Sequence, residues 1–150
     1  MPGYKGHIAG GIVTGALAIG SAAVVHRFTD SPLQLSALMG FCLLGSLFPD
    51  SDTDSKGQNL FYAIFVLMDG FLIYRHAYKL AAWLGLFAML PALGHHRGWT
   101  HSWPAMLLVG SPILIVPSVL LGTGNITLFI PFYLSFTLGY FSHLLLDRII

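Results

Sequence analysis

The 150-residue chain is 55% hydrophobic and 9% charged, whereas a typical soluble domain is roughly 25% charged. It contains no glutamate, its net charge is +1 and its mean hydropathy is +0.75. So few charges cannot cover the surface of a water-soluble protein of this size, and the composition therefore predicts an integral membrane protein with a single domain over residues 1–150. The small net charge gives no sign of a nucleic-acid partner. The single Cys42 excludes an intramolecular disulfide and a Cys-rich zinc site.

About six apolar helical segments are expected in chain order, and roughly 17–25 residues are needed to span a bilayer. We place them at residues 6–25, 33–48, 58–74, 77–93, 102–121 and 126–147. The second, third and fourth are near the lower limit, so one hairpin could be partly re-entrant. The glycines of the first segment, Gly11 and Gly15 among them, favour close helix packing, although glycine is also common in membrane helices. The expected fold is an all-α, polytopic membrane helical bundle with short hairpins.

Polar residues from four separated stretches fall at one membrane face if successive segments cross in alternate directions. This face receives His7, Asp50, Asp52, Asp54, His95, His96, Arg97, His101, His143 and Asp147. The other face receives only His26, Arg27, Asp30, Arg75, His76 and Lys79. This convergence is the strongest functional inference that the residues alone support.

Histidine and aspartate are ligands that hold zinc and other divalent metals. His143 and Asp147 are four residues apart and share a helical face. The whole set exceeds the three or four ligands of one ion and suits a two-metal site that hydrolyses a phosphoester. Simpler interpretations remain open, because "DSDTD" is also compatible with a solvated turn and "SHLLLD" with a helix-end histidine beside a carboxylate. His26 and His76 are expected to be ordinary interfacial residues.

Asp69 differs from these residues because it lies inside an apolar segment, away from the polar face. An intramembrane carboxylate is a functional candidate by default. We expect instead a structural partner such as Arg75 or Lys79, or a protonated side chain.

The motifs of the chain resemble those of a known family. His7 followed by glycines, "LGSLFPDSD", "HHRGWTHS" and "GYFSHLLLD" are similar to the motif set of the YdjM-type family of predicted inner-membrane metal-dependent hydrolases. The resemblance covers nearly the whole chain, and the family is thought to be distantly similar to zinc-dependent phospholipase C and P1 nuclease. It implies functional roles for His7, Asp50, Asp52, His96, Arg97, Thr100, His101, Ser102, His143 and Asp147. His95 and Asp54 are additional to the motif set, and their roles stay open.

The resulting hypothesis is a metal-dependent hydrolase that acts on a phosphoester in a lipid or lipid-linked substrate, with an amide or another ester as alternatives. The metal would be zinc, one or two ions, or else manganese or magnesium, held by His7, Asp50, Asp52, His96, His101, His143 and Asp147. The expected catalytic residues are Arg97, Asp52, Thr100 and Ser102. Arg97 would bind a phosphate or pair with Asp50 or Asp147. Thr100 or Ser102 would orient a ligand or cap the following helix.

A second hypothesis is a metal-binding membrane protein without catalysis, namely a transporter, a sensor or a structural site. Membrane lipids are the expected partners in either case, in an inner (plasma) membrane that the chain crosses several times. Four Lys or Arg residues at the polar face against three at the other give a faint positive-inside bias towards a cytoplasmic site. The oligomeric state, the substrate and the identity of the metal are not predicted.

Overall fold

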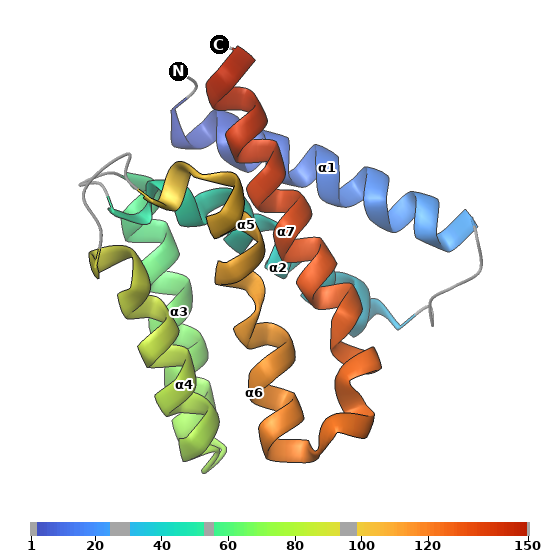
Figure 1. The fold of residues 1–150 in the computed structure, drawn as a ribbon, viewed down its shortest axis with the longest axis vertical. Helices are drawn as coiled ribbons and strands as arrows, with labels where there is room; N and C mark the ends of the chain where they lie inside the picture. The colour runs from blue at the N-terminus through green and yellow to red at the C-terminus, as the bar shows by residue number, and fades with distance from the viewer. Residues whose placement is uncertain (1–2, 25–30, 53–55, 94–98, 150) are drawn as a thin grey trace.

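The computed structural model describes residues 3–24, 31–52, 56–93 and 99–149, and this part of the chain is all-helical (Figure 1). The α-helices are α1 (Tyr4–Val24), α2 (Pro32–Leu47), α3 (Lys56–Tyr74), α4 (Tyr78–Met89), α5 (Trp103–Gly110), α6 (Pro112–Leu121) and α7 (Ile126–Ile149). Short 3₁₀ helices are η1 (Phe48–Asp52), η2 (Leu90–Leu93), η3 (Trp99–His101) and η4 (Thr123–Asn125). The described residues contain no strand, so the all-α prediction is confirmed.

The helices follow the six predicted segments, and two prolines account for the main differences. The segment predicted at 102–121 is divided into α5 and α6 at Ser111, where the Ser111 N–H bonds to the Leu108 carbonyl at 3.1 Å. Pro112 follows and has no N–H to continue the α-helical ladder. Pro91 has the same effect at the end of α4, which passes into η2. The α5–α6 pair still forms one continuous apolar stretch.

Four helical stretches of the described chain are long and apolar enough to span a bilayer. They are Pro32–Ser51, Lys56–Tyr74, Trp103–Leu121 and Thr123–Arg148. Large apolar side chains on them face outwards, such as Leu67 on α3 and Val119 on α6, which are 75% and 70% exposed. A lipid environment would cover these side chains, so the structure supports a multi-pass membrane protein.

Helices α1, α2 and α7 pack against one another, and the start of α1 and the end of α7 lie at the same end of the molecule (Figure 1). The closest approach joins α2 to α7. A Cβ atom on Gly45 would overlap the carbonyl oxygen of Phe136, and one on Gly139 would overlap the carbonyl oxygen of Cys42. The two backbones therefore touch, and only glycine fits at these two positions.

The predicted close packing of the first helix is confirmed by its glycines. A Cβ atom on Gly11 would lie 3.0 Å from the Ser46 Cβ, and one on Gly15 would lie 2.9 Å from the Met39 sulfur. The Gly11 carbonyl also accepts a hydrogen bond from the Cys42 thiol at 3.3 Å. Small residues thus bring α1 against α2, and Cys42 is fully buried at this contact.

Aromatic rings fill the centre of the bundle between α2, α3 and α7. Phe48, Phe61 and Tyr140 are fully buried, and Phe136 is 1% exposed. The ring of Phe48 lies 5.8 Å from those of both Phe61 and Tyr140. These contacts tie η1 to α3 and α7, and η1 carries Asp50.

Gly45→Ala is expected to lower the free energy of unfolding by about 1–3 kcal/mol, because the added methyl group forces α2 and α7 apart. Gly40→Ala is the matched control on the same helix, since nothing lies within 4 Å of a Cβ atom there. It should leave stability unchanged or raise it slightly. Thermal unfolding in detergent measures both, and equal behaviour of the two variants would contradict a close α2–α7 contact.

Candidate metal centre

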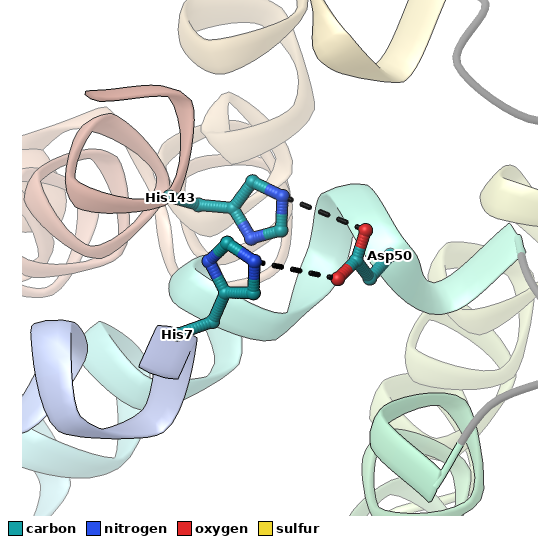
Figure 2. A group of neighbouring side chains, drawn as sticks. All are labelled: His7, Asp50 and His143. Carbon is teal, nitrogen blue, oxygen red and sulfur yellow. Dashed lines mark ion pairs between the residues drawn. The ribbon is translucent and has the colours of Figure 1, made fainter. Parts of the chain in front are cut away.

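Five side chains from four separate parts of the chain meet at one end of the helices. They come from the start of α1, from η1, from η3 and from the last turns of α7, and they are His7, Asp50, His101, His143 and Asp147. The predicted convergence of polar motifs at one face is thus present in the described part of the chain. Figure 2 shows His7 and His143 side by side, with Asp50 facing both rings.

The Nε2 atoms of the three histidines all face the two carboxylates. Each Nε2 atom lies between 3.3 and 3.7 Å from one oxygen of Asp50 and one oxygen of Asp147. Ligand atoms around one zinc ion, each about 2.0–2.2 Å from the metal, are separated by distances of this order. The spacing therefore fits a metal-binding cluster.

The two oxygens of each carboxylate face different histidines. Asp50 Oδ1 lies 3.6 Å from the Nε2 atoms of both His101 and His143, whereas Asp50 Oδ2 lies 3.7 Å from that of His7 (Figure 2 shows the His7 and His143 contacts). Asp147 repeats the arrangement, with Oδ2 towards His101 and His143 and Oδ1 towards His7. Both carboxylates are therefore oriented to bridge two adjacent positions.

The rings of His7 and His143 are stacked, with centroids 3.8 Å apart and planes 18° from parallel. Stacking sets their Nε2 atoms beside each other. Known two-metal sites hold their ions roughly 3.5–4 Å apart. His7, Asp50 and His143 form one group of possible ligands, and His101, His143 and Asp147 form a second, so the cluster could hold two ions.

His143 provides the clearest test of whether these residues suit a metal. Its Nδ1 donates a hydrogen bond to the Ser46 carbonyl at 2.8 Å, and a carbonyl oxygen only accepts. In the neutral ring, Nε2 then carries the free lone pair. The ring is fully buried, and Nε2 makes no hydrogen bond in the structure. A buried lone pair without a donor is costly, and a metal ion would satisfy it.

His101 is oriented by its neighbour Thr100. The Thr100 hydroxyl lies 3.2 Å from His101 Nδ1, and the Thr100 carbonyl accepts a hydrogen bond from the Tyr140 hydroxyl. Both Thr100 and Tyr140 are fully buried. This leaves His101 Nε2 directed at the carboxylates, so Thr100 orients a candidate ligand.

Ser102 has the capping geometry that the sequence suggested. It is the N-cap of α5, its hydroxyl accepts from the Ala105 N–H at 3.3 Å, and the same hydroxyl donates to the Trp99 carbonyl at 2.6 Å. The N-cap fixes the point at which η3 ends and α5 begins. Ser102 therefore helps to hold His101 in place.

The cluster is buried on one side and open on the other. The side chains of His7 and His143 are at most 2% exposed, whereas those of Asp50, His101 and Asp147 are 25%, 15% and 13% exposed. Arg148 lies on the outer side of α7, with its guanidinium 5.2 Å from the Trp103 ring centroid. The partly exposed side of the cluster is therefore formed by Asp50, His101 and Asp147.

Other predicted site residues are not placed at the cluster. His96 and Arg97 lie outside the described residues, as do His95 and Asp54, and so does the side chain of Asp52, whose backbone belongs to η1. His76 is in the turn between α3 and α4, where its Nδ1 lies 2.8 Å from the Tyr78 hydroxyl. This contact agrees with its interpretation as a residue outside the site.

For Asp69, the expected basic partner is wrong for the described residues, and the alternative of a protonated side chain stays a prediction. Asp69 forms no ion pair with Arg75 or Lys79, and one of its carboxylate oxygens is buried without a hydrogen bond. The Arg75 guanidinium lies instead 5.9 Å from the ring centroid of Phe71. Closeness in the sequence was therefore not enough to predict which side chains contact Asp69.

Sequence reasoning missed two residues that hold the candidate ligands in position, Ser46 and Tyr140. Ser46 acts through its backbone carbonyl, which no residue-type pattern could identify. Tyr140 lies three residues before His143 on α7, and its role depends on the contact with Thr100, 40 residues away. Only the tertiary packing of α2, η3 and α7 reveals both.

The fold and the cluster define a class: a multi-pass helical membrane protein with a His/Asp centre at one end of its helices. The model of the family described as YdjM inner membrane protein matches residues 1–150, so the chain belongs to this family. No curated protein and no solved structure matches the chain. The family assignment supports an inner-membrane location.

Thr100→Val is expected to weaken zinc binding by about 10–100-fold, because it removes the hydroxyl that orients His101. Thr137→Val is the matched control, since the Thr137 hydroxyl bonds only to the Tyr133 carbonyl within α7 at 2.8 Å. Zinc titration of detergent-purified protein measures both affinities. Equal affinities for the two variants would show that Thr100 does not orient a ligand.

Proposed function

We propose that this protein is a membrane-embedded metal-dependent hydrolase that uses two divalent ions, zinc first among them, to cleave a phosphoester in a lipid or lipid-linked substrate. One observation carries the proposal. Asp50 and Asp147 each direct one carboxylate oxygen at His7 and the other at His143. A single structural ion needs no such bridging geometry.

The residues divide into two groups of ligands. In the proposed arrangement, His101 and His143, with one oxygen from each carboxylate, would hold one ion with four ligands. His7 and the remaining two oxygens give three ligands, which leaves a position for water or substrate. The resemblance adds Asp52 and His96 as further ligands, and these stay predictions.

Bound ions of this kind lower the pKa of a bound water and neutralise charge that develops on a phosphoryl group. In the reaction, the water oxygen forms a bond to phosphorus, the P–O ester bond breaks, and the departing alcohol takes a proton. Asp50 and Asp147, whose side chains are 25% and 13% exposed, would hold the ions beside the reacting phosphate. Arg97, which the resemblance places at the site, would bind the remaining phosphate oxygens as a bidentate donor.

A lipid substrate follows from the place of the cluster. The candidate ligands lie at or beside the ends of two membrane-spanning stretches, Pro32–Ser51 and Thr123–Arg148. A phosphate group at the membrane surface would thus reach the carboxylates while its hydrocarbon part stays in the bilayer. Metal transport is less well supported. The structure has a cavity between α3, α4, α6 and α7, but its lining side chains are apolar and offer no ligand to a metal ion on a path through the bundle.

The number of bound ions tests the metal part of the proposal. Wild-type protein loaded with zinc should hold two ions per chain, and His7→Ala should hold one, because only the three-ligand position loses its histidine. His76→Ala is the control, since His76 lies in the α3–α4 turn. Elemental analysis after removal of free zinc gives the counts. Wild-type protein without bound metal would contradict the proposal.

Hydrolysis tests the catalytic part. Zinc-loaded protein should release phosphate-containing products from phospholipids or polyprenyl phosphoesters in mixed micelles, and a chelator should abolish the activity. Asp147→Asn should reduce the rate at least about 100-fold, because it weakens both ligand groups at once. Two bound ions with no hydrolysis of any phosphoester lipid would instead favour the alternative of a metal protein without catalysis.

A further inference from the structure

An apolar cavity lies between the α3–α4 hairpin and helices α6 and α7. Its volume is about 230 Å³, and it is partly open to the surroundings of the protein. The lining comes from α2, α3, α4, α6 and α7 and includes Phe65, Trp83, Ile113, Val116 and Phe129. The lining side chains are apolar, so the cavity selects for a ligand without polar groups.

The cavity is separated from the metal centre by a single layer of aromatic rings. Phe87 and Phe136 line the cavity, and their rings lie 5.6 and 6.2 Å from the ring of Phe48. Phe48 precedes Asp50 by two residues in η1. Along α7, the seven residues from Phe136 to His143 correspond to about 10 Å at 1.5 Å per residue. The cavity thus begins about this distance from the cluster, deeper along the same helices.

The surroundings of the cavity restrict what can enter it. Helices α3, α6 and α7 belong to stretches that are long and apolar enough to span a bilayer, so hydrocarbon would surround the helices that line the cavity. Pockets that enclose a drug-sized molecule measure roughly 300–1,000 Å³. The smaller volume here suits one hydrocarbon chain and excludes a whole lipid or a polypeptide helix.

We propose that this cavity binds one hydrocarbon chain of the phosphoester lipid whose phosphate is held at the metal centre. The inference rests on the proposed function for the identity of the headgroup, and it adds a specificity site for the apolar part of the substrate. Binding of the hydrocarbon chain in the cavity would hold the phosphate of the same lipid at the metal centre. Substrates whose chains are too short to reach the cavity would lose this binding energy, so long-chain substrates would be favoured.

The test uses two matched variants on α6. Val116 lines the cavity and is 9% exposed, whereas Val119, one turn later, is 70% exposed and is not part of the lining. Val116→Phe fills the cavity, and Val119→Phe adds the same bulk to the outer surface. The probe is a phosphatidic acid with a diazirine near the end of one acyl chain, and mass spectrometry identifies the labelled residues after irradiation.

In wild-type protein and in Val119→Phe, the label should concentrate on buried or partly buried cavity residues of α3 and α4, such as Phe65 and Leu84. Val116→Phe should reduce this labelling several-fold, with zinc content unchanged. Labelling that is spread evenly over outward-facing residues, or that is unaffected by Val116→Phe, would overturn the inference. If Val116→Phe loses its zinc, Ile113→Phe replaces it as the cavity-filling variant.

A second arm uses a polyprenyl phosphate with a diazirine in the chain and distinguishes the two sources of hydrocarbon. The preferred chain type is the one that labels Phe65 and Leu84 more strongly and whose labelling is more sensitive to Val116→Phe. Because labelling needs no turnover, cavity labelling without hydrolysis would reject the proposed function and leave the chain-binding site. Hydrolysis without cavity labelling would support the proposed function and reject the chain-binding site.

Discussion

The direct contact between the backbones of α2 and α7 is the constraint on which the metal centre depends. Gly45 and Gly139 allow the two helices to touch, and the Ser46 carbonyl thereby comes within 2.8 Å of His143 Nδ1. That hydrogen bond fixes which ring nitrogen faces the carboxylates. The same crossing brings Asp147, one turn beyond His143 on α7, opposite Asp50 in η1, which follows α2. The geometry of the candidate metal centre therefore depends on Gly45 and Gly139, because a side chain at either position would force α2 and α7 apart.

The helices divide into a polar end and an apolar middle. His7, Asp50, His101, His143 and Asp147 occupy one end, whereas rings such as Phe48, Phe61 and Tyr140 fill the layer beneath them. This layer separates the charged cluster from hydrocarbon, where unpaired charges would be costly. A lipid molecule has the same division, with a charged phosphate at one end and hydrocarbon below it. The proposed substrate therefore matches the protein along its length.

The sequence was sufficient to predict the helical segments and the convergence of His7, Asp50, His101, His143 and Asp147, because apolar runs of known length determine which motifs share a membrane face. His143 and Asp147 needed only helical periodicity. The break at Ser111 follows from Pro112, yet such prolines are also tolerated within membrane helices, so it was not predicted. The carbonyl of Ser46, the Tyr140–Thr100 hydrogen bond and the unpaired Asp69 depend on helix contacts that no local pattern encodes. The division of carboxylate oxygens between histidines is likewise a property of three-dimensional geometry alone.

X-ray absorption at the zinc edge of the metal-loaded protein is the most direct test of a bridged two-ion centre. The account predicts nitrogen and oxygen ligands at about 2.0–2.2 Å with imidazole scattering, and a second zinc at roughly 3.5–4 Å. His7→Ala should abolish the zinc–zinc feature and keep the imidazole signal of His101 and His143. A wild-type spectrum with imidazole ligands but no second zinc would contradict the bridged centre, and one without imidazole would contradict the site altogether.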